Sequence, residues 1–347
     1  MRPGDRSRAD LLSRPHAGDG ERVPRRSARP DDDQAPPLRI LVLLGPTGTG
    51  KSRVAVEVAE ALGGEIVGCD ALQIYRGLDA ATGKPTDDER HRVPHALVGT
   101  VDPRHDYSLA EYVRDADAAV AAIAARGRVP IVVGGTGLYL RGLLKGVVPA
   151  PGRDAARRDR LRRLLARFGA ARLHGALAAR DPGSAARIAP ADTQRLLRAL
   201  ELAGPGPIWS DRIAAAGTWS TPGERYDALK IGLTLDRDLL AARLTARVDR
   251  FLESGLEEEV AHLLAAGVPE SANAFKAIGY REALRARSLG LDLGTERDAI
   301  VTATRRYAKR QRTWFRREPG VVWMDASGDP DALAGEIVAS WRRFVAC

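Results

Sequence analysis

The sequence predicts an α/β protein in which a parallel sheet is flanked by helices and an all-α domain is inserted into the chain. The first observation is a pair of continuous aliphatic runs, residues 38–44 and 129–133, which are typical of strands buried on both faces. The second is the alternation of helical patterns with strands, as in a parallel sheet covered by helices. The third is residues 153–202, where the apolar pattern is only helical, which predicts the insertion; Leu161, Leu164, Leu165 and Phe168 would share one helical face there.

The chain divides into three predicted parts. Residues 1–37 are rich in Arg, Asp, Pro and Gly without apolar periodicity, and we expect them to be disordered. Residues 38–147 and 206–347 are expected to form the core with its C-terminal helices, and residues 148–205 the helical insertion. The expected core elements are, in order, strand 38–44, helix 52–62, strand 65–68, helix 110–126, strand 129–133, a turn-rich stretch 208–227, strand 229–235 and helix 238–264.

The composition narrows the class of protein. The 347 residues carry a net charge of +9 and a sequence pI of about 9.9, which suggests a polyanionic partner, although basic proteins often bind no nucleic acid. Cys69 and Cys347 are far apart, so no disulfide framework or paired-cysteine metal site is expected, and a reducing cytoplasm fits. The apolar runs are too short to span a bilayer, so we expect no membrane partner.

Residues 45–52 match the phosphate-loop (P-loop) pattern G-x-x-x-x-G-K-[ST] between a strand and a helix, which is the context that the pattern requires. Its glycines let backbone N–H groups converge on phosphate oxygens, and the N-terminus of the following helix favours an anion. Lys51 adds a positive charge, and Ser52 can bind Mg²⁺. The predicted phosphate-binding residues are Gly45, Pro46, Thr47, Gly48, Thr49, Gly50, Lys51 and Ser52. The pattern predicts binding of a phosphate ester but does not name the reaction.

Asp70 follows the second strand, and three roles are open to it. Most proteins with this loop transfer a group from a nucleoside triphosphate and use an aspartate after a strand to hold Mg²⁺. Here the strand at 129–133 is followed by Gly134, Gly135 and Thr136, without a carboxylate. Asp70 could therefore serve the metal, act as a general base, or cap the next helix. Residue chemistry alone leaves these alternatives open.

Basic side chains form stripes on three predicted helices. Along residues 298–317 one line contains Arg305, Lys309, Arg312 and Arg316, flanked by Arg306, Arg310 and Arg317, with Ile300, Tyr307 and Trp314 on the opposite side as anchors to the core. A solvated face normally mixes charges of both signs, so we interpret this stripe as a contact with a polyanion.

The other two stripes are shorter. Arg243, Arg247 and Arg250 lie along residues 238–264, either as surface ion pairs or reaching phosphates held by the P-loop. On the helix that Asp192 is expected to cap, Gln194, Arg195 and Arg198 face outward, which suits contacts with RNA.

Five segments together resemble the tRNA dimethylallyltransferase family. They are residues 70–79 with 82–85, residues 134–139, residues 194–201, residues 277–282 and residues 307–315, and they occur in the family's order. The resemblance covers about residues 38–325 and is far more specific than the P-loop alone. It implies transfer of a dimethylallyl group from dimethylallyl diphosphate to N6 of adenine 37 in the tRNA anticodon stem-loop, in a reaction that needs Mg²⁺ and consumes no ATP. The sequence gives no clear oligomer signal, and we expect a monomer.

The resemblance also implies residue roles. Asp70 would be the general base on the adenine amine, Thr136 would orient the reacting groups, and Arg243 with Arg247 would stabilise the diphosphate held by the P-loop. The residues expected to contact tRNA are Asp70, Ala71, Leu72, Gln73, Thr136, Arg158, Gln194, Arg195, Leu196, Leu197 and Arg198, joined by Arg305, Lys309 and Arg312 from the basic stripe.

Two positions depart from the family's pattern. Ala71 stands where the family commonly has Ser, and Lys276 where it often has Gln. Three competing functions remain as alternatives: a transferase that acts on free adenine nucleotide, a P-loop kinase or NTPase, and an RNA-binding module without catalysis. A small acceptor would not need the insertion, an NTPase should turn over ATP, and a pure binding module should tolerate the loss of Asp70.

Overall fold

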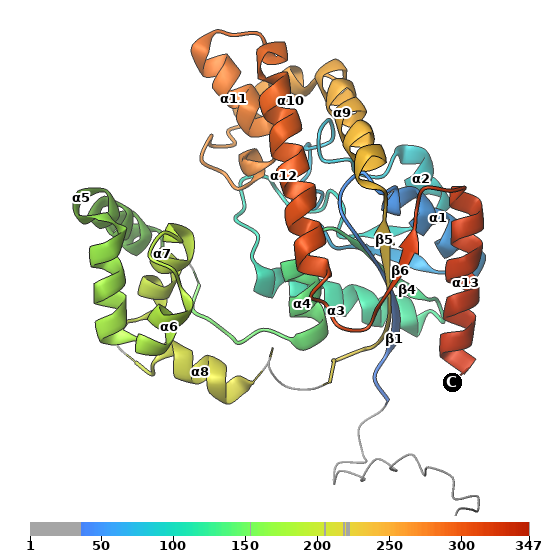
Figure 1. Ribbon diagram of the computed structural model, residues 1–347, viewed down its shortest axis with the longest axis horizontal. Coiled ribbons are helices and arrows are strands. Elements are labelled where there is room, and N and C mark those ends of the chain that lie inside the picture. The colour runs from blue at the N-terminus through green and yellow to red at the C-terminus, as the bar shows by residue number, and fades with distance from the viewer. Residues whose placement is uncertain (1–35, 153, 205, 218, 220–222, 347) are drawn as a thin grey trace, which may run out of the picture. The chain divides into compact units, whose positions relative to one another are not determined.

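The computed structural model describes residues 36–152, 154–204, 206–217, 219 and 223–346 (Figure 1). The disorder expected of residues 1–37 falls almost entirely outside the described residues. Residues 37–347 form one compact unit. Within its described part, no helix is both long enough and apolar enough to cross a membrane.

The core is a six-stranded parallel sheet with the strand order β3-β2-β4-β1-β5-β6. The strands are β1 (Arg39–Leu44), β2 (Glu65–Gly68), β3 (His95–Ala96), β4 (Pro130–Gly134), β5 (Asp227–Thr234) and β6 (Val321–Asp325). The four predicted strands are confirmed to within a few residues, whereas β3 and β6 were not foreseen. β3 has only two residues, and β6 exposes Val322 and Trp323 at the sheet edge, so neither shows the continuous apolar pattern of a buried strand.

Both faces of the sheet are buried, which explains the continuous aliphatic runs. Leu41 and Leu43 of β1 point to a core shared with α1 (Lys51–Leu62) and α13 (Pro330–Ala346). Ile40 and Val42 point to the opposite core, shared with α3 (Leu109–Ala125) and α4 (Gly137–Lys145). Because side chains alternate along a strand, each face needs its own helical cover. The predicted α/β class with helices on both faces is confirmed.

The carboxyl edge of the sheet brings three loops together. β4 lies between β1 and β2, so the P-loop after β1, Asp70 after β2 and Thr136 after β4 are neighbours at one edge. The backbones approach very closely there, because a Cβ on Gly134 would lie 2.1 Å from the carbonyl oxygen of Cys69. Ligands of open α/β sheets bind at this edge.

The helical insertion has a core of its own. It contains α5 (Ala155–Arg180), α6 (Pro182–Arg187), α7 (Thr193–Leu202) and α8 (Trp209–Ala216). Leucines from α5 and α7, among them Leu177 and Leu196, pack together. The backbone N–H of Ser210 donates to Asp181 Oδ2 at 3.1 Å, which fastens α8 to α6.

Two expectations about this region were wrong. The stretch 208–227 contains α8, since Ile208 and Trp209 start a helix there in place of turns. Phe168 was expected to share a face with Leu161, Leu164 and Leu165, but it is 41% exposed, whereas the three leucines pack against the core of the insertion. The helix is interrupted directly after it, at Gly169, which has a φ of +76°.

The remaining helices follow β2 and β5 in the chain. They are α2 (Asp87–Arg92), α9 (Arg237–Glu253), α10 (Leu256–Ala265), α11 (Tyr280–Leu289) and α12 (Arg297–Phe315), with short 3₁₀ turns at Ala274–Lys276 and Leu293–Glu296. The single helix expected over residues 238–264 is two helices. Gly255 adopts a φ of +77°, a left-handed conformation that ends α9 and starts α10.

Candidate active site

The P-loop connects β1 to α1 and forms one wall of the site. Gly48 and Gly50 both have a φ of +87°, a conformation that favours glycine and lets the chain turn tightly into α1. The Lys51 ammonium group donates to the Pro46 carbonyl at 2.7 Å, and the Thr49 hydroxyl donates to the same oxygen at 2.9 Å. These two hydrogen bonds tie the end of the P-loop to its start and so fix its backbone conformation.

A cavity of about 1170 Å³ opens beside this loop. Thr47, Gly48, Gly50, Lys51 and Ser52 line it. Gly45, Pro46 and Thr49, which were also expected to bind phosphate, are buried residues of the same loop and do not line the cavity. Pockets for single ligands are typically about 300–1,000 Å³, so this cavity has room for more than a diphosphate.

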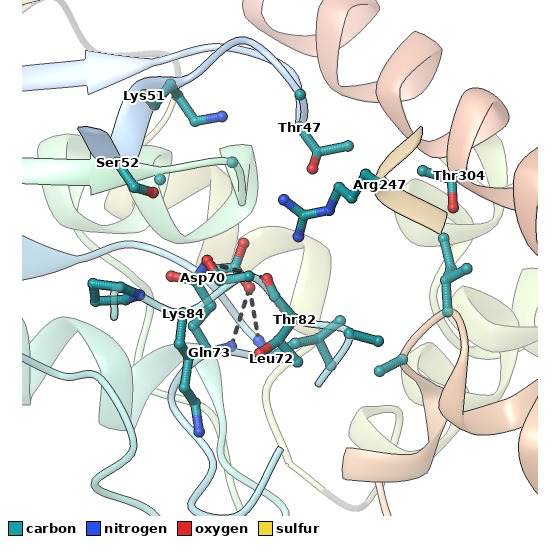
Figure 2. Close-up of a pocket in the computed structure, with 18 of the residues that line it drawn as sticks. Thr47, Lys51, Ser52, Asp70, Leu72, Gln73, Thr82, Lys84, Arg247 and Thr304 are labelled. Atoms are coloured by element: carbon teal, nitrogen blue, oxygen red, sulfur yellow. Dashed lines mark hydrogen bonds between the residues drawn. The ribbon is translucent and has the colours of Figure 1, made fainter. Parts of the chain in front are cut away.

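Asp70 lines the cavity opposite the P-loop. Its Oδ1 accepts hydrogen bonds from the backbone N–H groups of Leu72 at 2.9 Å and Gln73 at 3.3 Å, as Figure 2 shows. The local capping alternative is therefore partly right, although a turn follows Asp70, not a helix. Burial raises the pKa of the carboxyl, against the opposing effect of these N–H groups, Lys51 and Arg247. The structure thus contains a desolvated carboxylate in a cationic cavity.

Of the cations that line the cavity, Lys51 and Arg247 act on the charge of Asp70. Burial lowers the pKa of Lys51 to about 8, while Asp70 opposes that shift. Burial also lowers the pKa of Arg247, again opposed by Asp70. In Figure 2 the guanidinium group of Arg247 extends into the space between Thr47 and Asp70. Since burying unpaired cations is unfavourable, this cavity is suited to binding an anion.

Arg243 lies one helical turn before Arg247 on α9 and also lines the cavity. Among the described residues, Arg243 forms no ion pair or hydrogen bond, so its charge is available to a ligand. The guanidinium of Arg247 stacks over the Phe251 ring at 4.8 Å and fits closely against Gly83, where a Cβ would lie 2.2 Å from it. The stripe on α9 therefore faces the phosphate site, as one of its two interpretations proposed.

Thr136 joins the loop after β4 to the segment that carries Asp70. Its hydroxyl oxygen accepts from the Ala71 N–H at 3.0 Å, and its own N–H donates to the Cys69 carbonyl at 3.2 Å. Both bonds flank Asp70, so Thr136 fixes the position of the carboxylate.

The inner face of α12 completes the cavity with residues that were not assigned to the site. Thr304, Tyr307 and Gln311 all line it. Tyr307 was expected to be an anchor on the core side; instead its hydroxyl interacts with Thr136, and burial raises its pKa. A sequence signal existed, because Thr304 and Gln311 are polar residues in line with the apolar Ile300, Ala308 and Phe315.

Comparisons with known proteins agree with this geometry. The chain matches the model of the IPP transferase family over residues 73–318 and that of the isopentenyl transferase family over residues 38–95. A tRNA dimethylallyltransferase of Anaeromyxobacter dehalogenans is 47% identical over 300 residues, which are 86% of this chain and 99% of the relative. This chain belongs to the tRNA dimethylallyltransferase family.

Solved structures of the family share the fold. A tRNA isopentenylpyrophosphate transferase from Bacillus halodurans matches with a TM-score of 0.65 and 33% identity, covering 88% of this chain and 96% of that one. A eukaryotic dimethylallyltransferase solved while acting on tRNA matches with a TM-score of 0.72 and 26% identity, covering 88% of this chain and 77% of that one.

The basic stripe of α12 in this family member is divided. Arg306 and Arg310 line the cavity, whereas the three residues of the stripe that were expected to contact tRNA lie away from its wall. Arg305, Lys309 and Arg312 of α12 do not line the cavity, and Arg305 donates to the Thr245 hydroxyl at 3.0 Å. Gln194 and Arg195 are exposed on α7, which Asp192 caps as expected by accepting from the Arg195 N–H. These five side chains remain available to a large polyanion.

Two of the residues expected to contact tRNA cannot do so through their side chains. Leu196 is 0% exposed and Leu197 is 7% exposed, because both pack in the core of the insertion. They were assigned because they lie in the same contiguous motif as Gln194 and Arg195. Consecutive residues of a helix point in different directions, however, so only part of such a motif can face a ligand.

Arg158 and Arg198 have a structural partner. Both form ion pairs with Glu201, at 3.3 Å and 3.0 Å, and the Glu201 side chain is only 3% exposed. The two arginines thus compensate a buried carboxylate, which limits what each can offer to tRNA. Gln73 is engaged as well, since its Nε2 donates to the carbonyls of Thr82 and Gly83.

Proposed function

We propose that this site transfers the dimethylallyl group of dimethylallyl diphosphate to N6 of adenine 37 in the anticodon loop of tRNA, giving N6-dimethylallyladenosine. The observation that carries the proposal is one cavity in which the Asp70 carboxylate faces two cations, Lys51 of the P-loop and Arg247 of α9. A proton acceptor and an anion site are the two elements that alkylation by an allylic diphosphate requires. The names of the relatives support the substrates.

Asp70 acts on the acceptor. The exocyclic amine of adenine is a weak nucleophile, so its proton must be removed as the new C–N bond forms. Burial raises the pKa of Asp70, which makes its carboxylate a stronger base than a solvated aspartate. Thr136 keeps that carboxylate in place through the Ala71 N–H.

The P-loop and α9 act on the donor. As N6 bonds to the allylic carbon, the C–O bond of the donor breaks and its electron pair leaves with the diphosphate, while the N6 proton passes to Asp70. Lys51, Arg243 and Arg247 neutralise the charge that develops on the leaving oxygen. The anion in turn favours the protonated form of Lys51.

Mg²⁺ is the proposed cofactor, and the residues present fit it in a limited way. The described residues contain no group of three acidic, His or Cys side chains that could hold a metal alone. Mg²⁺ commonly binds through few protein ligands together with substrate phosphates and water. The Ser52 hydroxyl, which lines the cavity beside Lys51, would be the protein ligand. The ion would supply further neutralisation of the diphosphate.

We assign the contacts with tRNA to basic and polar residues outside the cavity. Arg305, Lys309 and Arg312 on α12, with Gln194 and Arg195 on α7, would contact the phosphates around the extruded adenine. We also propose that the protein acts as a monomer. A tRNA substrate supports a cytoplasmic location.

The test is direct. We expect unmodified tRNA, incubated with the protein, dimethylallyl diphosphate and Mg²⁺, to gain the mass of one dimethylallyl group on adenosine when its nucleosides are analysed by mass spectrometry. Asp70→Asn should lose most of this transfer and change tRNA affinity little, because the amide cannot accept the proton. ATP consumption without any change in nucleoside mass would contradict the proposal and favour the NTPase alternative.

A further inference from the structure

Gln311 is a buried polar side chain at the centre of the inner face of α12. It is 5% exposed, and its carboxamide makes two hydrogen bonds to backbone groups outside its own helix. Its Oε1 accepts from the Thr47 N–H at 2.9 Å, and its Nε2 donates to the Gly135 carbonyl at 2.9 Å. Both ends of the amide are therefore occupied, and both partners belong to loops of the active site.

These two bonds connect the donor side to the acceptor side. Thr47 belongs to the P-loop, and Gly135 immediately precedes Thr136, which holds the segment of Asp70. A carboxamide can accept from an N–H and donate to a carbonyl at the same time, whereas a carboxylate only accepts and a thioether does neither well. Among side chains of this length, only Gln can therefore make both hydrogen bonds.

The Gln311 carboxamide packs closely against the loop after β4. A Cβ on Gly135 would lie 2.2 Å from Gln311 Nε2, so only glycine allows this approach. One turn before Gln311 the same helix presents Tyr307 to Thr136, and one turn after it Trp314 lies against Gly137, where a Cβ would be 2.2 Å from the indole. Helix α12 thus contacts the loop on both sides of Thr136, and Gln311 extends this contact to the P-loop.

We propose that Gln311 is a positioning residue for the transfer reaction: it fixes the P-loop relative to the turn of Thr136, so that the departing diphosphate and the attacking amine are aligned. The inference rests on the proposed function. Gln311 touches neither reactant in this role; it acts through the Thr47 and Gly135 backbones. Alignment of reacting groups is sensitive, since an error of about 1 Å can cost about 100-fold in rate.

The experiment compares Gln311→Met, Gln311→Glu and the control Thr313→Ala in the full chain. Thr313 lies on the exposed side of α12, with its hydroxyl bonded only to the Lys309 carbonyl of the same helix. The measurements are kcat, the KM for each substrate, inhibition by inorganic pyrophosphate, and Tm. We expect Gln311→Met to lower kcat by about 10- to 100-fold while the KM for tRNA stays within about 3-fold, and Thr313→Ala to match the unaltered protein.

Gln311→Glu separates positioning from packing. The carboxylate can still accept from the Thr47 N–H but cannot donate to Gly135, and it adds a negative charge beside the P-loop. Pyrophosphate should therefore inhibit Gln311→Glu less well than it inhibits Gln311→Met.

Three results would overturn the inference. The first is a lower Tm with an unchanged kcat, and the second is a normal kcat with equal inhibition of both variants by pyrophosphate. The third is that neither variant folds. Each result would make Gln311 a packing residue. An unaltered protein that transfers no dimethylallyl group would instead count against the proposed function, so the two failures are distinguishable.

Discussion

Helices α9 and α7 both carry arginines in a stripe, but these arginines have different partners. Arg243 and Arg247 of α9 face the phosphate cavity, where Asp70 is the acidic side chain that acts on Arg247. Arg198 of α7, joined by Arg158 of α5, pairs with the buried Glu201. Identical residue types at similar spacing therefore serve a ligand in one helix and a structural carboxylate in the other.

The comparison teaches that a basic stripe identifies a charged face but not what neutralises it. In α9, Arg243 and Arg247 form no ion pair with any described residue, although Asp70 lies close enough to act on Arg247, so their charge remains for an anionic substrate. In α7 a single glutamate on the next turn removes two arginines from the available set. The following predictions test this difference, from the largest expected effect to the smallest.

Arg247→Ala should lower kcat/KM for dimethylallyl diphosphate by about 100- to 1,000-fold, the usual range for loss of one preorganised group that stabilises developing negative charge. Steady-state kinetics with saturating tRNA would measure it. Arg198→Ala is the matched control on α7 and should keep kcat/KM for the donor within a few-fold. Equal losses in the two variants would erase the distinction between the helices.

Arg305, Lys309 and Arg312 changed together to alanine should weaken tRNA binding by about 10-fold or more at physiological salt and reduce the salt dependence of the binding constant by about two to three phosphate contacts. Filter binding over a range of salt concentrations gives both quantities. The KM for the donor should stay unchanged, since these residues do not line the cavity. An unaltered salt dependence would show that these three residues are solvated and do not contact tRNA phosphates.

The pH profile of kcat/KM should show the interaction between Arg247 and Asp70. Burial raises the pKa of Asp70 above its usual 3.8, and Arg247 opposes that shift. Activity should fall as pH decreases through this raised pKa, because protonation removes the base. In Arg247→Met the acid limb should move to still higher pH, whereas Arg198→Met should leave it in place. A limb that does not move in Arg247→Met would show that the two groups do not interact.

The smallest effect is expected within α7 itself. Arg195 is exposed and forms only a 3.4 Å ion pair with Asp192, so Arg195→Ala should raise the KM for tRNA by about 3-fold through loss of one phosphate contact. Arg198→Ala should mainly lower Tm, because Glu201 keeps its burial but loses a partner. Steady-state kinetics and thermal unfolding would be measured for both variants. A lower Tm in Arg195→Ala with a raised KM for tRNA in Arg198→Ala would contradict the assignment.

Much of the site followed from residue chemistry and order along the chain. The P-loop, Asp70 and Thr136 follow three buried strands, and parallel strands place their carboxyl ends at one edge. The errors share one cause. Leu196, Leu197, Tyr307 and Gln311 were misassigned or missed because a helix hides which of its faces meets a neighbour until that neighbour is placed.

The sequence by itself determined the α/β class and the P-loop pattern, because these depend on local periodicity and on spacing along the chain. It placed Asp70 after a buried strand, and only the family resemblance proposed a role for it. Only the tertiary structure decided which polar groups neutralise one another. Gln311 meets Thr47, 264 positions away, and Glu201 meets Arg158 across two helices. Such pairings depend on distances between elements that are remote in the chain, and no spacing within a single helix or strand encodes them.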